Sequence, residues 1–90
     1  MSYVDAIIEI PFAPAGVTMA DIYQLLSDEL GNGISEISEE SVINRQGKHK
    51  KFIVEVTCRS HSPMMNEVRV NRRIEYKTKK TRLRLWIRKC

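Results

Sequence analysis

The chain has 90 residues, of which 42% are hydrophobic and 29% charged, and its formal net charge is +4. This length predicts one compact domain over residues 1–90, because a chain of this size buries about 60–65% of its unfolded surface in a single core. No apolar run approaches the roughly 18–20 residues of a transmembrane helix, and two cysteines are too few for a disulfide framework. We therefore expect a cytoplasmic protein without a membrane partner.

Charge is distributed unevenly between the two halves of the chain. Residues 1–44 contain eight acidic and no basic residues, whereas residues 45–90 contain 15 basic and three acidic residues, so their net charges are −8 and +12. Such asymmetry indicates a polyanionic partner or a charge match within the fold or between molecules.

The N-terminal third predicts a strand followed by a helix. Residues 3–12 alternate between apolar and mixed side chains, as a half-buried strand does. Two prolines and a glycine predict a loop over 11–16. Residues 18–30 predict an amphipathic helix in which Thr18 is the N-cap and Asp21 stands at the third helical position.

The remaining elements are predicted to be mainly strands. Residues 34–46 alternate imperfectly, and the change of phase at 39–41 predicts either a bulge or an edge strand, whereas residues 50–60 alternate clearly. The stretch 63–77 fits two descriptions: a short helix near 63–70 that starts at a proline, or an alternating strand. Residues 81–89 predict a final strand.

This order of elements predicts an α+β fold with a ferredoxin-like antiparallel sheet. The segment "GKHKKFIVEV" (47–56) resembles the third strand of the RNA recognition motif, and "AIIEIPF" (6–12) falls where the first-strand motif of that family lies. The resemblance implies the RRM-like fold. It implies no base stacking on this strand, because Lys51 and Ile53 occupy the family's aromatic positions.

The outward face of the final strand is the main candidate site. Its alternating members are three arginines and a tryptophan: Arg82, Arg84, Arg88 and Trp86. Guanidinium groups bind phosphate in a bidentate manner and an indole stacks on a base, so this pattern is typical of a nucleic-acid contact. In the alternative interpretation, the acids of the neighbouring first strand, Asp5 and Glu9, neutralise these cations as cross-strand ion pairs.

Two further basic clusters are candidate phosphate contacts or solubilising segments. The first lies in the loop after the predicted edge strand and contains Arg45, Lys48, Lys50 and Lys51. The second precedes and opens the final strand and contains Arg72, Arg73, Lys79 and Lys80. Their convergence in space would favour nucleic-acid binding.

The sequence therefore predicts a small nucleic-acid-binding domain, with RNA favoured over DNA, that contacts mainly phosphates. We expect no enzyme activity, cofactor or metal, because no catalytic constellation is present and Cys58 and His61 form the only close ligand pair. The alternative is a protein assembly or inhibitor module. Such a module could self-associate as a homo-oligomer, with the acidic half of one copy against the basic half of the next. It could also bind the acidic surface of another protein through its basic half.

Overall fold

The computed structural model describes residues 2–90, which form five strands and one α-helix. The elements in chain order are β1 (Tyr3–Pro14), α1 (Met19–Leu30), η1 (Gly31–Gly33), β2 (Ile34–Asn44), β3 (Gly47–Arg59), η2 (Pro63–Asn66), β4 (Arg69–Tyr76) and β5 (Lys79–Lys89), where η marks a short 3-10 helix. All five strands belong to one sheet in the order β2-β3-β1-β5-β4, and every neighbouring pair is antiparallel.

The prediction of a ferredoxin-like, RRM-like fold is wrong. That fold alternates two helices with four strands, whereas the described chain has a single α-helix and a fifth strand. The segment 63–77, for which a short helix near 63–70 and a strand were the two alternatives, forms one 3-10 turn at Pro63–Asn66 and then β4 from Arg69. The β-branched Val68, Val70 and Ile74 stand at alternate positions, which suits a pleated strand better than a helix.

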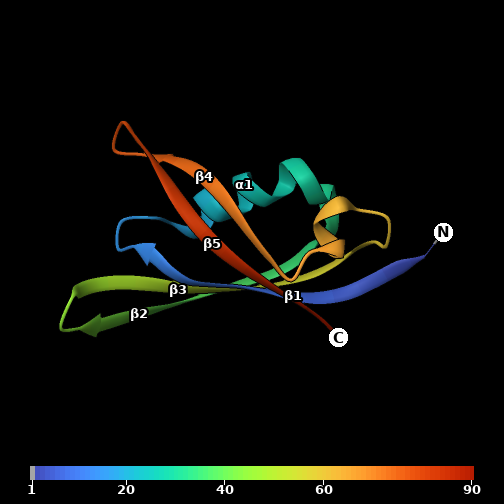
Figure 1. Ribbon diagram of the computed structural model, residues 1–90, viewed down its shortest axis with the longest axis horizontal. Helices are drawn as coiled ribbons and strands as arrows, with labels where there is room; N and C mark the ends of the chain where they lie inside the picture. Colours follow the sequence, from blue (N-terminus) through green and yellow to red (C-terminus); the bar gives the residue numbers. More distant parts are fainter. Residues whose placement is uncertain (1) are drawn as a thin grey trace.

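The helix α1 forms where the sequence predicts it. Thr18 and Asp21 make a reciprocal capping box, with N···O distances of 3.2 and 2.9 Å. The apolar residues Ile22, Leu26 and Leu30 are buried on the face that covers the sheet. Figure 1 shows α1 on one side of the sheet only, so the opposite, outer face of the sheet carries no layer.

The core lies between α1 and the inner face of the sheet. Its buried members from the strands are Ala6, Ile8, Ile10, Ala13, Phe52, Val54, Val56, Cys58, Val70, Leu83, Leu85 and Ile87. The strands contribute these residues at alternate positions, so their intervening side chains point to the outer face.

Two strand irregularities differ from the predictions. The expected loop at 11–16 is partly strand, because a register shift between Ile10 and Ala13 lets β1 continue to Pro14. A bulge accommodates Pro11, which has no N–H to donate to a ladder. In β2, an edge strand as predicted, the shift lies between Ile34 and Glu36, and pairing is regular over 39–41.

The sheet divides into two hairpins that share β1. Strand β1 pairs with β3 along most of its length, but it pairs with β5 only over Ala6–Glu9. Beyond that point the β4–β5 hairpin turns away from the β2–β3 hairpin, and Figure 1 shows it passing in front of α1. The β4–β5 hairpin also touches the loop after β1, since a Cβ on Gly16 would clash with the hydroxyl of Tyr76.

Candidate nucleic-acid interface

The outer face of the β4–β5 hairpin is strongly cationic. Strand β5 buries Leu83, Leu85 and Ile87 and leaves the intervening residues exposed. The exposed residues are Arg82, Arg84, Trp86 and Arg88, as the alternation in the sequence predicts. Strand β4 adds its own outer residues, because Arg69 lies opposite Trp86, Asn71 opposite Arg84 and Arg73 opposite Arg82. We call this set of seven residues the basic face: Arg69, Asn71, Arg73, Arg82, Arg84, Trp86 and Arg88.

Trp86 is the exposed aromatic side chain at the centre of the basic face. Its side chain is 41% exposed, and the guanidinium carbon of Arg69 lies 5.5 Å from the ring centroid. Beside it is a shallow hollow of about 290 Å³, lined by Ile7, Glu9, Val68, Arg69, Trp86, Ile87 and Arg88. Val68 is 71% exposed. The hollow therefore offers an indole, three aliphatic side chains and two guanidiniums to a flat, anionic ligand, and its one carboxylate, Glu9, is paired with Lys51.

The carboxylates of β1 have partners on the side of the sheet away from β5. Glu9 forms an ion pair with Lys51 on β3 at 3.3 Å, and Asp5 accepts a hydrogen bond from the Thr57 hydroxyl at 2.7 Å. On the other side, Glu9 stands opposite Trp86 and Ile7 stands opposite Arg88. Among residues 2–90, no carboxylate forms an ion pair with an arginine of the basic face.

Two rows of side chains cross the outer face from β2 to the basic face. The first row, in strand order, is Glu36, Glu55, Ile7 and Arg88. The second is Ser38, Ile53, Glu9, Trp86 and Arg69. Neighbouring strands lie about 4.8 Å apart, so each row passes from neutral or acidic to basic groups within about 20 Å. The outer face is therefore polarised.

Three of the basic residues that the sequence nominates as phosphate contacts have protein partners instead. Arg72 lies on the inner side of β4 and binds Glu29 of α1 at 2.7 Å, with two further hydrogen bonds from its Nε. Lys50 binds Glu39 at 3.2 Å and the carbonyl of Val17 at 2.9 Å. The third, Lys51, holds Glu9. Each of these three cations therefore stabilises a contact between two elements of the fold. Their charges are compensated and do not add to the basic face.

The remaining nominated residues lie at the two hairpin tips. Arg45 lies in the turn of the β2–β3 hairpin and Lys48 follows it, and Lys79 and Lys80 follow the turn of the β4–β5 hairpin. Both tips lie at the same end of the molecule in Figure 1, but the hairpins diverge toward them. The two basic clusters therefore belong to separate arms. Arg69, which lies over Trp86, is not among the nominated residues, because the sequence leaves its segment open between helix and strand and so does not show which residue it faces.

A metal centre or a membrane-spanning helix is not found in the described chain. Residues 2–90 contain no group of three or more Cys, His, Asp and Glu that could hold a metal ion. Cys58 is buried, and burial raises the pKa of its thiol, which keeps it protonated and unlike a metal-binding thiolate. No helix within the described residues is long and apolar enough to cross a bilayer.

Comparison with known proteins adds no relative. No protein-family model, curated protein or solved structure matches the chain.

Proposed function

We propose that the domain binds single-stranded nucleic acid on the basic face. Arg82 and Arg84 lie about 6.5–7 Å apart along β5, close to the spacing of successive phosphates in an extended strand, and Arg88 follows about 13 Å beyond Arg84 with Trp86 between them. Guanidinium groups form bidentate, charge-assisted bonds with phosphate oxygens. Most of the affinity comes from these contacts, and binding is weakly dependent on sequence.

Trp86 supplies the preference for single strands. A base released from a duplex can stack on the exposed indole, with the side chains of Ile7 and Val68 beside it, whereas a paired base cannot reach it. The cation of Arg69 over the same ring favours an electron-rich aromatic partner in the stack and places a guanidinium beside the adjacent phosphate.

The observation that carries this proposal is the missing neutralisation of the basic face. Arg73 stands directly opposite Arg82, and like charges in this position are destabilising by up to about 1 kcal/mol. The β1 carboxylates are meanwhile bound by Lys51 and Thr57. A phosphate backbone would supply the counter-charge that the described protein does not.

The test uses the single tryptophan of the chain, Trp86, as a reporter. Its emission is measured while a 12-nucleotide oligouridylate, the matching DNA oligonucleotide or a duplex is added. With about six phosphate contacts, the slope of log affinity against log salt is expected near −4 for a single strand. Quenching by the single strands at lower concentration than by the duplex supports the proposal. Equal affinity for both, or no quenching, contradicts it.

Trp86→Ala then isolates stacking, with affinity followed by the anisotropy of labelled oligonucleotide. Loss of a stacked base costs about 1–3 kcal/mol, so single-strand affinity should fall roughly 5- to 150-fold. Tyr23→Ala is the matched control, since Tyr23 is a comparably exposed aromatic residue on α1. Equal losses in the two variants would show that the stacking role is wrong.

Self-assembly is the second candidate, and one further observation favours it. Glu36 stands opposite Glu55 on the same outer face that carries the opposed Arg73 and Arg82. Stacking the β2 side of one copy on the basic face of another would relieve both like-charge pairs. Such a contact is head-to-tail, so it closes into rings or extends into filaments. Sedimentation of nucleic-acid-free protein that shows association at low salt, lost at high salt, would favour this candidate.

A further inference from the structure

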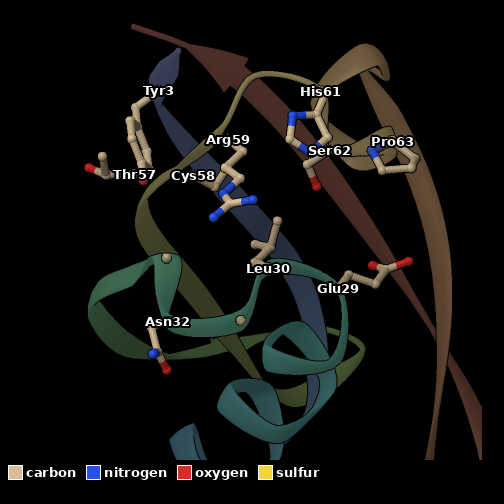
Figure 2. Close-up of a pocket in the computed structure, with 12 residues that line it drawn as sticks. Tyr3, Glu29, Leu30, Asn32, Thr57, Cys58, Arg59, His61, Ser62 and Pro63 are labelled. Carbon is tan, nitrogen blue, oxygen red and sulfur yellow. The ribbon is translucent and has the colours of Figure 1, made fainter. Parts of the chain in front are cut away.

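A second hollow lies at the end of the sheet away from the hairpin tips. It has a volume of about 550 Å³, within the range of small-molecule sites. Figure 2 shows its lining, which comes from the start of β1, the end of α1, η1, the end of β3 and the turn before η2. No residue of β4 or β5 lines it, so it is separate from the basic face.

One tight turn sets the polar wall of this hollow. The backbone N–H of Ser62 donates to the carbonyl of Arg59 at 3.0 Å, which brings these two residues and the intervening His61 around the same rim. Figure 2 shows the Arg59 side chain extending toward Leu30 and the Ser62 hydroxyl directed to the same side. The turn thus brings a guanidinium and an imidazole to the lining of the hollow, with the buried Ser62 hydroxyl next to them.

The electrostatics of the hollow favour an anion. Arg59 forms no ion pair with any of residues 2–90. The one carboxylate in the lining, Glu29, is bound by Arg72 at 2.7 Å and is therefore compensated. The uncompensated charge facing the hollow is the positive charge of Arg59.

Ser62 gives a second, independent indication of a ligand. The residue is only 9% exposed, and its Oγ has no hydrogen-bond partner in the described chain. It stands at the N-cap position of η2, where serine ordinarily caps, yet its side chain makes no capping bond. Buried hydroxyls in native proteins nearly always have a partner, and one that has none calls for an explanation. A ligand oxygen in the hollow would be that partner after a rotation about the Cα–Cβ bond.

We propose that this hollow binds a small phosphate monoester about the size of a mononucleotide. Arg59 would bind two phosphate oxygens, since its planar fork matches them, and Ser62 would donate to a third. The lining residues Tyr3, Leu30 and Pro63 give the rest of the ligand an apolar wall, and the Tyr3 ring is 58% exposed. The proposal needs no residue of the basic face.

The experiment records ¹H–¹⁵N NMR spectra of the full chain during titration with inorganic phosphate and with AMP. Both probes are expected to shift the amide signals of residues 57–62, with AMP binding more tightly because it also fills the apolar part of the hollow. Arg59→Gln is expected to weaken phosphate binding about tenfold or more, as loss of a charge-assisted bond does. Arg84→Gln is the control on the basic face and should leave these shifts unchanged.

Ser62→Ala separates a ligand contact from a structural role. Removing an unpartnered buried hydroxyl should leave the thermal midpoint of the free protein equal or higher, while phosphate affinity falls about tenfold. A lower midpoint with unchanged phosphate affinity would overturn the role of Ser62. Two results of the phosphate titration would overturn the site: chemical-shift changes confined to β5, or unchanged phosphate affinity in Arg59→Gln. A parallel titration with acetate that shows the same affinity as phosphate would overturn it too. These measurements do not depend on the basic face, so they test the phosphate site even if the basic face binds no oligonucleotide.

Discussion

The two hairpins that share β1 are built alike but are charged differently. The β2–β3 hairpin, residues 34–59, contains five basic and four acidic residues, whereas the β4–β5 hairpin, residues 69–89, contains ten basic residues and one acidic residue. In the first, Lys51 stands opposite Glu40 and binds Glu9 on the other side. In the second, Arg73 stands opposite Arg82. One hairpin is internally compensated and the other is not.

This difference shows that charge compensation in the molecule is local. The acids of the N-terminal half could in principle neutralise the basic face, but the fold pairs three of them with other cations: Glu29 with Arg72, Glu39 with Lys50 and Glu9 with Lys51. Each of these pairs joins two different elements. The basic face receives none of these acids, so its positive potential is preserved and available to an external anion.

The largest expected effect comes from neutralising the β5 arginines together. The triple change of Arg82, Arg84 and Arg88 to Gln removes three phosphate contacts and should lower single-strand affinity roughly 100-fold or more at 50 mM salt. It should also flatten the log–log salt slope by about 2. Titrations of labelled oligonucleotide at 50–200 mM salt measure both quantities. An unchanged slope would remove these side chains from the interface.

Arg72→Gln and the pair Arg45→Gln with Lys48→Gln sharpen this test. Arg72 lies on the same hairpin but is bound to Glu29, so its removal should change affinity less than about threefold while lowering stability by up to about 1 kcal/mol. The change at the β2–β3 tip removes two positive charges from the other arm. If the Arg45→Gln, Lys48→Gln variant loses as much oligonucleotide affinity as the β5 triple variant, the oligonucleotide is not bound by the β4–β5 hairpin alone.

The two hairpin turns differ in strain, which predicts opposite effects of glycine. Gly47 has φ +114° in the β2–β3 turn, whereas Lys77 and Thr78 have φ +49° and +64° in the β4–β5 turn. A β-branched residue at positive φ is strained by about 1–3 kcal/mol. Thr78→Gly should therefore stabilise the protein by about 1 kcal/mol, and Gly47→Ala should destabilise it by about 1–2 kcal/mol. Urea unfolding measures both, and a loss of stability in Thr78→Gly would contradict the strain.

The smallest effect concerns the two opposed like-charge pairs. Arg73→Glu and Glu36→Lys each turn a repulsive cross-strand pair into an attractive one, so each should stabilise the protein by about 0.2–1 kcal/mol. The gains should shrink at high salt because both pairs are exposed. Their effects on oligonucleotide affinity should be opposite, with Arg73→Glu weakening and Glu36→Lys strengthening it. Affinity changes of the same sign would argue against a polarised outer face.

Local patterns in the sequence predict several elements and side-chain orientations. The capping residues Thr18 and Asp21 locate α1, and the alternation after Thr81 separates buried from exposed side chains on β5. These features depend on residues close together in the chain, so the sequence contains them directly. The pairing of β5 with the first strand, expected from the ferredoxin-like arrangement, is also found, although that fold is wrong.

Features that depend on distant residues could not be read in the same way. The alternation of Val70 and Ile74 allows a strand over 69–76, but the ladder that β5 provides and the inner face that buries Val70 decide between strand and helix, and both depend on distant residues. The ion pairs of Lys50, Lys51 and Arg72 join elements between 11 and 43 positions apart. Composition alone therefore nominated these three cations together with the residues of the basic face.

The pairing of β1 with β5 has a consequence for how the chain folds. Residues 6–9 meet residues 86–89, so the seam between the two hairpins joins the beginning of the chain to its end. Contacts of such long sequence separation close late and slow the search for the native state, because their loop entropy must be overcome first. On the ribosome, β1 must leave the exit tunnel and wait until β5 has been synthesised and has left the tunnel as well. Only then can the strand at the centre of the sheet acquire its second neighbour.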